Sequence, residues 1–116
     1  MRIGELANRL GVATSKIRFL EAKGLVRSTR RPSKYREYDE GAFEHLEFVL
    51  QAQSLGFTLD EISRALVEAG GRKRLRCHEM VRRLNAKLEE IDVHIAQTRA
   101  LRRRVVRMIA HLESRP

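Results

Sequence analysis

Residues 3–25 read IGELANRLGVATSKIRFLEAKGL, and this stretch decides the fold of the amino-terminal part of the chain. Its apolar residues recur at intervals of three and four, which predicts two short amphipathic helices. Gly11 is expected to end the first helix; Thr14 or Ser15 is expected to cap the second, which Gly24 closes. Two helices of about two turns joined by a tight turn form a helix-turn-helix, whose second helix can enter the major groove of DNA.

The next segment, from Arg27 to Tyr38, suits a solvent-facing hairpin better than a helix, because it contains the turn formers Pro32 and Ser33, followed by Tyr35 and Tyr38. It is also rich in arginine and lysine, which neutralise phosphates and release condensed counterions. The hairpin is therefore a candidate wing along a DNA backbone.

Charge is distributed unevenly along the 116 residues, which carry a formal net charge of +9. Residues 1–39 hold ten Lys and Arg against four Asp and Glu, residues 40–70 hold one against six, and residues 71–116 hold thirteen against five. The first basic block favours a polyanionic partner, the alternative being a basic chain that merely stays soluble. Because only 5% of the residues are aromatic, the hydrophobic core that one chain can bury is small, and a partner subunit would help to supply more apolar surface.

Two further helices are expected before the glycine pair Gly70–Gly71. The first begins at Asp39, with acidic residues at its positive end, and is expected to end at Gly56. The second begins with Thr58, and Glu61 three residues later completes a capping box.

A heptad-like seam predicts one long helix over residues 77–113. Such a helix cannot bury its own apolar stripe, so a second copy of the chain is the expected partner; the alternative, folding back onto its own domain, lacks a second long helix to pack against. The predicted fold is mainly α, with a DNA-binding domain at 1–70, a basic linker at 71–76 and a dimerisation helix at 77–113. The residues predicted to form the dimer seam are Leu84, Leu88, Ile91, Ile95, Leu101, Val105, Met108 and Leu112.

Several motifs in order resemble the MerR family of bacterial transcription regulators. The motifs are Ile3–Ala7, Ile17–Glu21, Gly24–Leu25, Tyr35–Tyr38 and Leu55–Ile62. The resemblance implies a winged helix-turn-helix domain, a second helix pair, and a long dimerisation helix. This helix is expected to form an antiparallel coiled coil with the same helix of a second copy. It also implies a mechanism: the dimer distorts a promoter whose spacer is too long, in response to an inducer, so that RNA polymerase engages both promoter elements.

The resemblance also implies contacts with double-stranded promoter DNA from both the recognition helix and the wing. Arg18 is as well suited to a phosphate as to a base edge, because most contacts in such complexes go to the backbone. The predicted DNA-binding residues are Thr14, Ser15, Lys16, Arg18, Arg31, Lys34, Tyr35 and Arg36.

Cys77 is the only cysteine, so an intramolecular disulfide is excluded and a reducing compartment is the simpler expectation. No signal peptide is evident at the amino terminus, and no segment is apolar enough to span a bilayer. We therefore expect a cytoplasmic protein with no membrane partner.

Cys77 is also the centre of three alternatives for the inducer. In an antiparallel dimer whose axis lies near residue 94 or 95, Cys77 and His78 would approach His111 and Glu113 of the second copy, giving ligand types that suit a transition metal such as zinc. The thiol could instead react with an oxidant or electrophile, because neighbouring arginines favour the thiolate. The third alternative is a cysteine that acts only as a small apolar residue.

Other functions fit the sequence less well. The sequence contains no paired carboxylates, Ser/His/Asp set or phosphate-binding glycine loop, so an enzyme is not predicted. A ligand-independent architectural DNA binder is the alternative to a regulator. The basic cluster from Arg102 to Arg107 is either a solvated surface or a site for an anionic partner.

Overall fold

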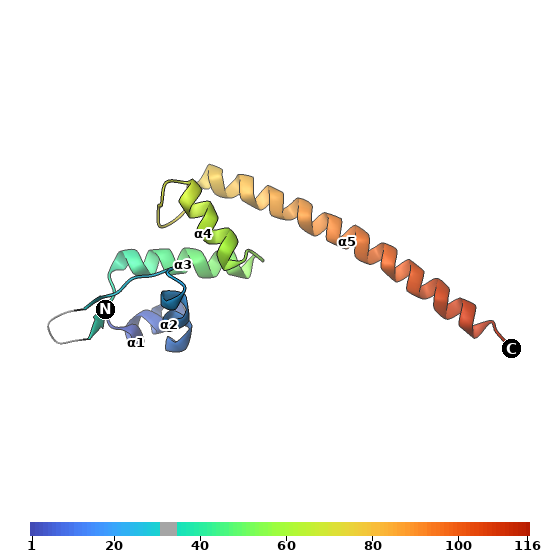
Figure 1. The fold of residues 1–116 in the computed structure, drawn as a ribbon, viewed down its shortest axis with the longest axis horizontal. Helices are drawn as coiled ribbons and strands as arrows, with labels where there is room; N and C mark the ends of the chain where they lie inside the picture. Colours follow the sequence, from blue (N-terminus) through green and yellow to red (C-terminus); the bar gives the residue numbers. More distant parts are fainter. Residues whose placement is uncertain (31–34) are drawn as a thin grey trace. The chain divides into compact units, whose positions relative to one another are not determined.

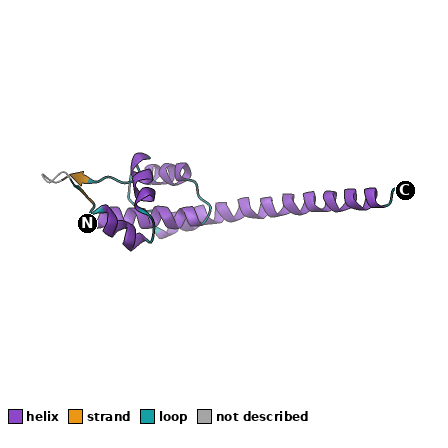
Figure 2. Cartoon of the chain, turned by 90° about the horizontal axis from the view of Figure 1, so that it is seen from below, coloured by secondary structure: helices purple, strands orange, loops and turns teal. Residues whose placement is uncertain are grey.

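The computed structural model describes residues 1–30 and 35–116, and it consists of two compact units, Met1–Leu75 and Arg76–Pro116 (Figure 1). Helices dominate both units, and the strands form one short hairpin (Figure 2). No described helix combines the length and apolar character that crossing a membrane requires. The elements are α1 (Ile3–Leu10), α2 (Thr14–Ala22), β1 (Thr29–Arg30), β2 (Arg36–Glu37), α3 (Glu40–Ser54), α4 (Leu59–Glu68) and α5 (Cys77–Glu113).

The helix-turn-helix forms where the apolar spacing predicted it. Gly11 ends α1 in the left-handed conformation, with φ of 69°, where a residue with a Cβ would be strained. The expected cap of α2 was wrong: Ala13 occupies the N-cap position and makes no side-chain hydrogen bond, while Thr14 begins the helix. The extended backbone of Ala13 is enough to start α2, so its first amides are left without a side-chain cap.

The core of the first unit lies where α1, α2 and α3 meet, and α4 packs on α3. The side chains of Leu6, Leu20, Leu46 and Val49 have no exposed surface. Tyr38, just after β2, is 2% exposed, so the carboxyl-terminal end of the wing packs into this core through the Tyr38 side chain. Complete burial of such side chains stabilises a fold by roughly 1.5–3 kcal/mol each.

The start of α4 confirms the predicted capping box. Thr58 Oγ1 accepts a hydrogen bond from the Glu61 amide at 3.1 Å, and the Glu61 carboxylate accepts one from the Thr58 amide at 2.9 Å. Behind this cap, Ile62, Ala65 and Leu66 are buried.

The wing is a two-stranded antiparallel hairpin in which Thr29 pairs with Glu37 and Arg30 pairs with Arg36. The backbone of Tyr38, beyond β2, is hydrogen-bonded to that of Met1 in both directions, at 2.7 Å and 2.6 Å. The chain before α1 therefore continues the hydrogen bonding of the wing.

The predicted linker at 71–76 is mostly part of the first unit. Leu75 is 9% exposed, the carbonyl of Lys73 lies 2.6 Å from Nδ1 of His45 on α3, and Arg72 Nε donates to the carbonyl of Ala69. Leu75, an apolar residue within the basic run, therefore packs this segment onto the first unit. The charge pattern of the run gave no indication of this packing.

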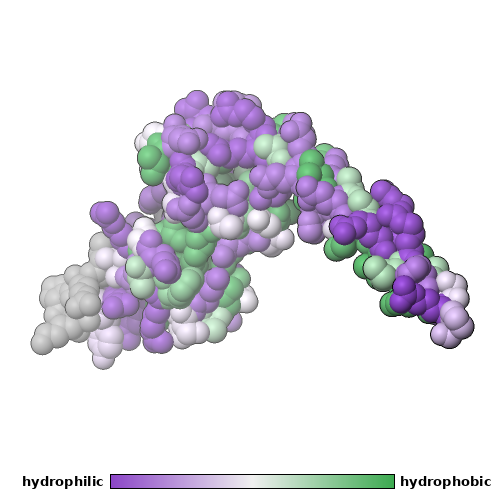
Figure 3. Space-filling model, turned by 45° about the vertical axis from the view of Figure 1, so that its right-hand side comes forward, coloured by the Kyte–Doolittle hydropathy of each residue, from purple (hydrophilic) through white to green (hydrophobic). Residues whose placement is uncertain are grey.

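The second unit is built on α5, whose 37 residues correspond to a length of about 55 Å. Every residue of α5 is described and none is buried within one chain. Apolar and polar surface alternate along this helix (Figure 3). An amphipathic helix with its apolar side uncovered requires a partner to stabilise it.

Candidate nucleic-acid interface

Helix α2 has two contrasting faces. Ile17 and Leu20 are fully buried, whereas Ser15, Arg18 and Phe19 are exposed. Because residues three and four apart share a face of a helix, these three exposed side chains lie together, away from the core. A recognition helix presents such a surface to the major groove.

Phe19 is an apolar ring within this basic surface. It is 46% exposed, and the Nζ atoms of Lys16 and Lys23 lie 5.5 Å and 5.6 Å from its centroid. Both distances fall within the range of cation–π attraction. The Phe19 ring therefore attracts the two lysine ammonium groups, and its exposed apolar surface is suited to contact with a thymine methyl group.

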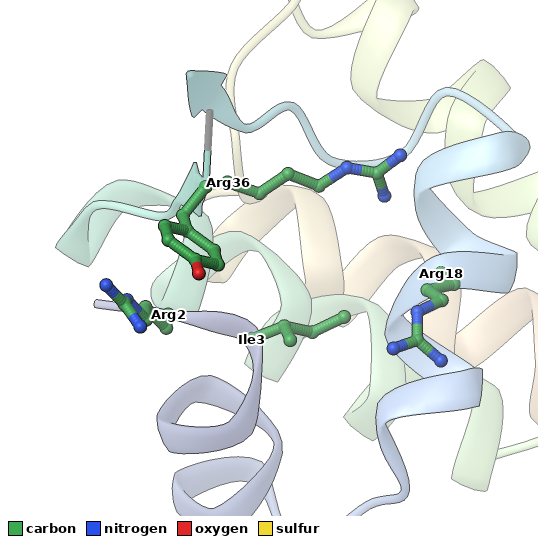
Figure 4. Close-up of a pocket in the computed structure, with 5 residues that line it drawn as sticks. Arg2, Ile3, Arg18 and Arg36 are labelled. Atoms are coloured by element: carbon green, nitrogen blue, oxygen red, sulfur yellow. The ribbon is translucent and has the colours of Figure 1, made fainter. Parts of the chain in front are cut away.

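A pocket of about 350 Å³ lies between the helix-turn-helix and the wing (Figure 4). It is lined by Arg2, Ile3, Arg18, Tyr35 and Arg36. Figure 4 shows Arg2 and Arg18 on opposite sides of Ile3, with the side chain of Arg36 directed towards α2. The planar guanidinium group binds phosphate oxygens through paired hydrogen bonds. A pocket with three such groups is suited to a phosphodiester of a nucleic-acid backbone.

Arg2 is a residue that the sequence pattern missed. Its Cζ lies 4.2 Å from the centroid of the Tyr35 ring, so the residue before α1 contacts the wing. The one available signal was a basic residue beside the first helix, and no periodicity relates it to Tyr35.

Arg18 differs from Arg36 in its pairing. Among the described residues none forms an ion pair with Arg18, whereas Arg36 Nη1 donates to Glu21 Oε2 at 2.9 Å. Arg18 can therefore bind an anion without first breaking an ion pair. Arg36 has to share its charge with Glu21.

Glu21 joins the recognition helix to the wing. Its carboxylate accepts hydrogen bonds from Ser28 Oγ at 2.7 Å, Arg36 Nη1 at 2.9 Å and the Tyr38 hydroxyl at 2.9 Å. One donor precedes β1, one lies on β2 and one follows it. Glu21 was part of a recognised motif, but the pattern gave no indication that it orients the hairpin.

These contacts change the acidity of both partners. Partial burial favours the neutral form of Glu21, but the hydrogen bonds from Ser28 and Tyr38 and the charge of Arg36 outweigh it, so the pKa of Glu21 lies below its ordinary value. Burial, and then the bond to Glu21, raise the pKa of Tyr38. Near neutral pH an ionised carboxylate therefore faces a neutral phenol.

Comparisons with known proteins identify the family of the chain. Residues 1–68 match the family described as MerR HTH family regulatory protein, and residues 43–108 match the family described as MerR, DNA binding. The chain belongs to the MerR family. It is a DNA-binding transcription regulator and not an enzyme, as the sequence motifs predicted.

Individual MerR relatives match over most of the chain. The mercuric resistance operon regulatory protein of Bacillus cereus is 36% identical over 98% of this chain and 83% of its own length. The transcriptional regulator CueR of Salmonella typhi is 31% identical over 93% of this chain and 78% of its own. The crystal structure of the regulator PbrR691 from Ralstonia metallidurans, in complex with lead(II), has a TM-score of 0.76 and 30% identity, covering 100% of this chain and 90% of that one.

The MerR fold places the predicted site residues in separate groups. Ser15 and Arg18 are exposed on α2, while Thr14 and Lys16 are partly covered; Tyr35 and Arg36 lie at the wing end of the pocket. The predicted wing residues Arg31 and Lys34 lie outside the described residues.

The predicted metal ligands are not brought together within one chain. Cys77 and His78 are exposed at the start of α5, and His111 is near its end, about 50 Å away along the helix. Within the described residues of a single chain, no group of three His, Cys, Asp or Glu side chains could hold a metal ion.

Proposed function

We propose that the protein acts as a homodimer that binds a symmetric promoter site and distorts its DNA, so that RNA polymerase engages both promoter elements when an inducer acts. One observation carries this proposal: the same chain contains a basic winged helix-turn-helix and a long helix whose apolar seam is exposed. A dimer would hold two DNA-binding heads at a fixed separation. The deformation energy of the duplex would then be the quantity under control.

The DNA contacts follow from the exposed surface of the first unit. In this proposal the pocket formed by Arg2, Arg18 and Arg36 holds a backbone phosphate, while Ser15 and Lys16 face the major groove. Phosphate contacts fix the position of the head on the duplex, and groove contacts supply sequence preference. The remaining proposed contacts are those of Thr14 and Tyr35, with Arg31 and Lys34 of the wing.

The inducer is proposed to act at Cys77. The names of two relatives, a mercuric resistance regulator and a regulator solved with lead(II), favour a thiophilic metal ion. One chain lacks a complete ligand set, so the metal would need Cys77 and His78 of one copy and His111 of the other. Because Cys77 is exposed, direct reaction of its sulfur with an oxidant or electrophile is the alternative signal.

In vitro transcription tests the function. A template with an over-long spacer should give more transcript when mercury(II), lead(II) or the thiol oxidant diamide is added to the bound protein, and Cys77→Ser should remove the response. Metal analysis of the same two proteins separates metal binding from thiol oxidation. A template with a spacer of ordinary length is the control, because polymerase should transcribe it without help.

An architectural, ligand-independent DNA binder is the second candidate, favoured by the lack of a complete metal-ligand group in one described chain. Such a protein would bend the same DNA equally with and without each probe. Unchanged transcription and no bound metal in either protein would support this reading over a regulated promoter.

A further inference from the structure

The apolar face of α5 follows a seven-residue repeat that is interrupted by Thr98 and Arg102. We call its two seam positions a and d. The a positions are Val81, Leu88, Ile95, Arg102 and Ile109, and the d positions are Leu84, Ile91, Thr98, Val105 and Leu112. In this assignment Leu101 and Met108, which were predicted to belong to the seam, occupy positions beside it. Most apolar residues of this seam are exposed in one chain, from 41% at Ile95 to 56% at Leu112, so the seam is free to receive a second copy.

Arg102 is the charged residue within this seam. A parallel pair in register would place the two Arg102 side chains against each other, which is unfavourable in an apolar interface. An antiparallel pair instead stacks each a residue on a d residue of the second copy. The two arginines then lie in different layers, so the antiparallel arrangement is favoured.

Charges beside the seam distinguish one antiparallel register from its neighbours. Asp92 and Arg99 occupy equivalent flanking positions, one heptad apart, and in an antiparallel pair equivalent flanks of the two helices meet. If the two-fold axis lies at Val93, Asp92 faces Asp92 of the second copy. If it lies at Ala100, Arg99 faces its own counterpart. Only an axis between Ala96 and Gln97 places each Asp92 opposite an Arg99.

The same register gives Arg102 a counterion. With the axis between Ala96 and Gln97, Asp92 of the second copy lies nearly level with Arg102, on the side of the seam to which Arg102 is closest. An arginine can keep the aliphatic part of its side chain in the apolar layer while its guanidinium group reaches a flanking carboxylate. In the register centred on Val93, the flanking residue at this level is Asn85, which carries no charge.

We propose that Asp92 of each copy pairs with Arg99 and Arg102 of the second copy, and that these two clusters set the register of the dimer, with its axis between Ala96 and Gln97. This inference rests on the proposed homodimer and specifies how the copies fit together. This axis lies beyond residues 94 and 95, where the proposed metal site would place it. Glu113 of the second copy then comes closest to His78, while His111 lies on the side of α5 away from the seam, so this register does not bring the proposed metal ligands together.

Charge reversal tests the pairing. Asp92→Arg should weaken the dimer about tenfold or more in sedimentation equilibrium, because each cluster becomes repulsive. Adding Arg99→Asp should recover most of the affinity, as expected for a coupled pair. Glu89→Arg is the matched control: it makes the same change of charge on the side of α5 away from the seam, and it should have little effect.

Cysteine cross-linking tests the register directly, in a Cys77→Ser background. Ile95→Cys with Thr98→Cys should give a covalent dimer on mild oxidation, because these positions face each other across the proposed axis. Ile91→Cys with Ile95→Cys should not, since they face each other only if the axis lies at Val93. The reverse cross-linking result, or a dimer insensitive to both charge reversals, would overturn the register while leaving the homodimer intact. A monomeric wild-type protein would overturn both.

Discussion

Arg18 is exposed on the recognition helix and pairs with no described carboxylate, so binding a phosphate costs it no internal contact. We predict that Arg18→Ala weakens binding to operator DNA by about 1–3 kcal/mol. If the lost partner is a phosphate, the slope of the logarithm of affinity against the logarithm of salt concentration should fall by about one. Fluorescence anisotropy at several salt concentrations measures both.

The matched control is Arg82→Ala, which removes the same charge from an exposed position on α5. It should leave affinity and salt slope nearly unchanged. Equal losses in the two variants would mean that total charge, and not the pocket, determines DNA binding.

Glu21→Gln should loosen the wing, because an amide is a weaker acceptor than a carboxylate for the guanidinium of Arg36. Since the folded pKa of Glu21 lies below its ordinary value, the ionised form contributes stability above the unfolded pKa, and this contribution is lost as pH falls through the folded pKa. Urea unfolding should show wild type to be more stable by about 1–2 kcal/mol at pH 7. The difference should shrink in acid.

Exposed Glu44 provides the comparison for that experiment. Glu44→Gln should be almost neutral throughout the pH range. A difference between wild type and Glu21→Gln that stayed constant into acid would show that ionisation of Glu21 is not its source.

At the scale of elements, local signals predicted most helix boundaries, but they misplaced the cap of α2 and gave no indication of long-range contacts. Gly11 and the box at Thr58 act within one turn, so they are visible in the sequence. The predicted cap of α2 was wrong because it relied on the preference of serine and threonine for the N-cap position. Ala13 adopts the extended N-cap backbone without a side-chain hydrogen bond. The contact of Arg2 with Tyr35 joins segments that only the folded chain brings together.

Removing the cap of α4 has an effect confined to that helix. Thr58→Ala should lower the free energy of unfolding by about 1 kcal/mol, since it leaves the Glu61 amide without its acceptor. Chemical denaturation measures the change. Ser63→Ala, within the same helix, should be neutral or slightly stabilising, because alanine is the better helix former. A larger loss for Ser63→Ala than for Thr58→Ala would contradict the role of the box.

At the scale of the whole molecule, the proposed dimer makes DNA binding depend on α5. Leu88→Asp places a charge in a seam position that is 54% exposed in one chain and covered in the pair. We predict a monomer in sedimentation experiments, with operator affinity reduced at least tenfold. Binding to a half-site should change little. A Leu88→Asp protein that still bound the full operator tightly would argue against two linked heads.

The exposed seam of α5 also has a consequence for the cell. α5 buries none of its residues in one chain, so in the proposed dimer the number of DNA-binding molecules would rise more steeply than the amount of chain synthesised. Promoter occupancy would then rise more steeply than in proportion to expression level. Below the dissociation constant of the dimer, a twofold change in chain concentration would change the dimer concentration up to about fourfold, before any inducer is involved.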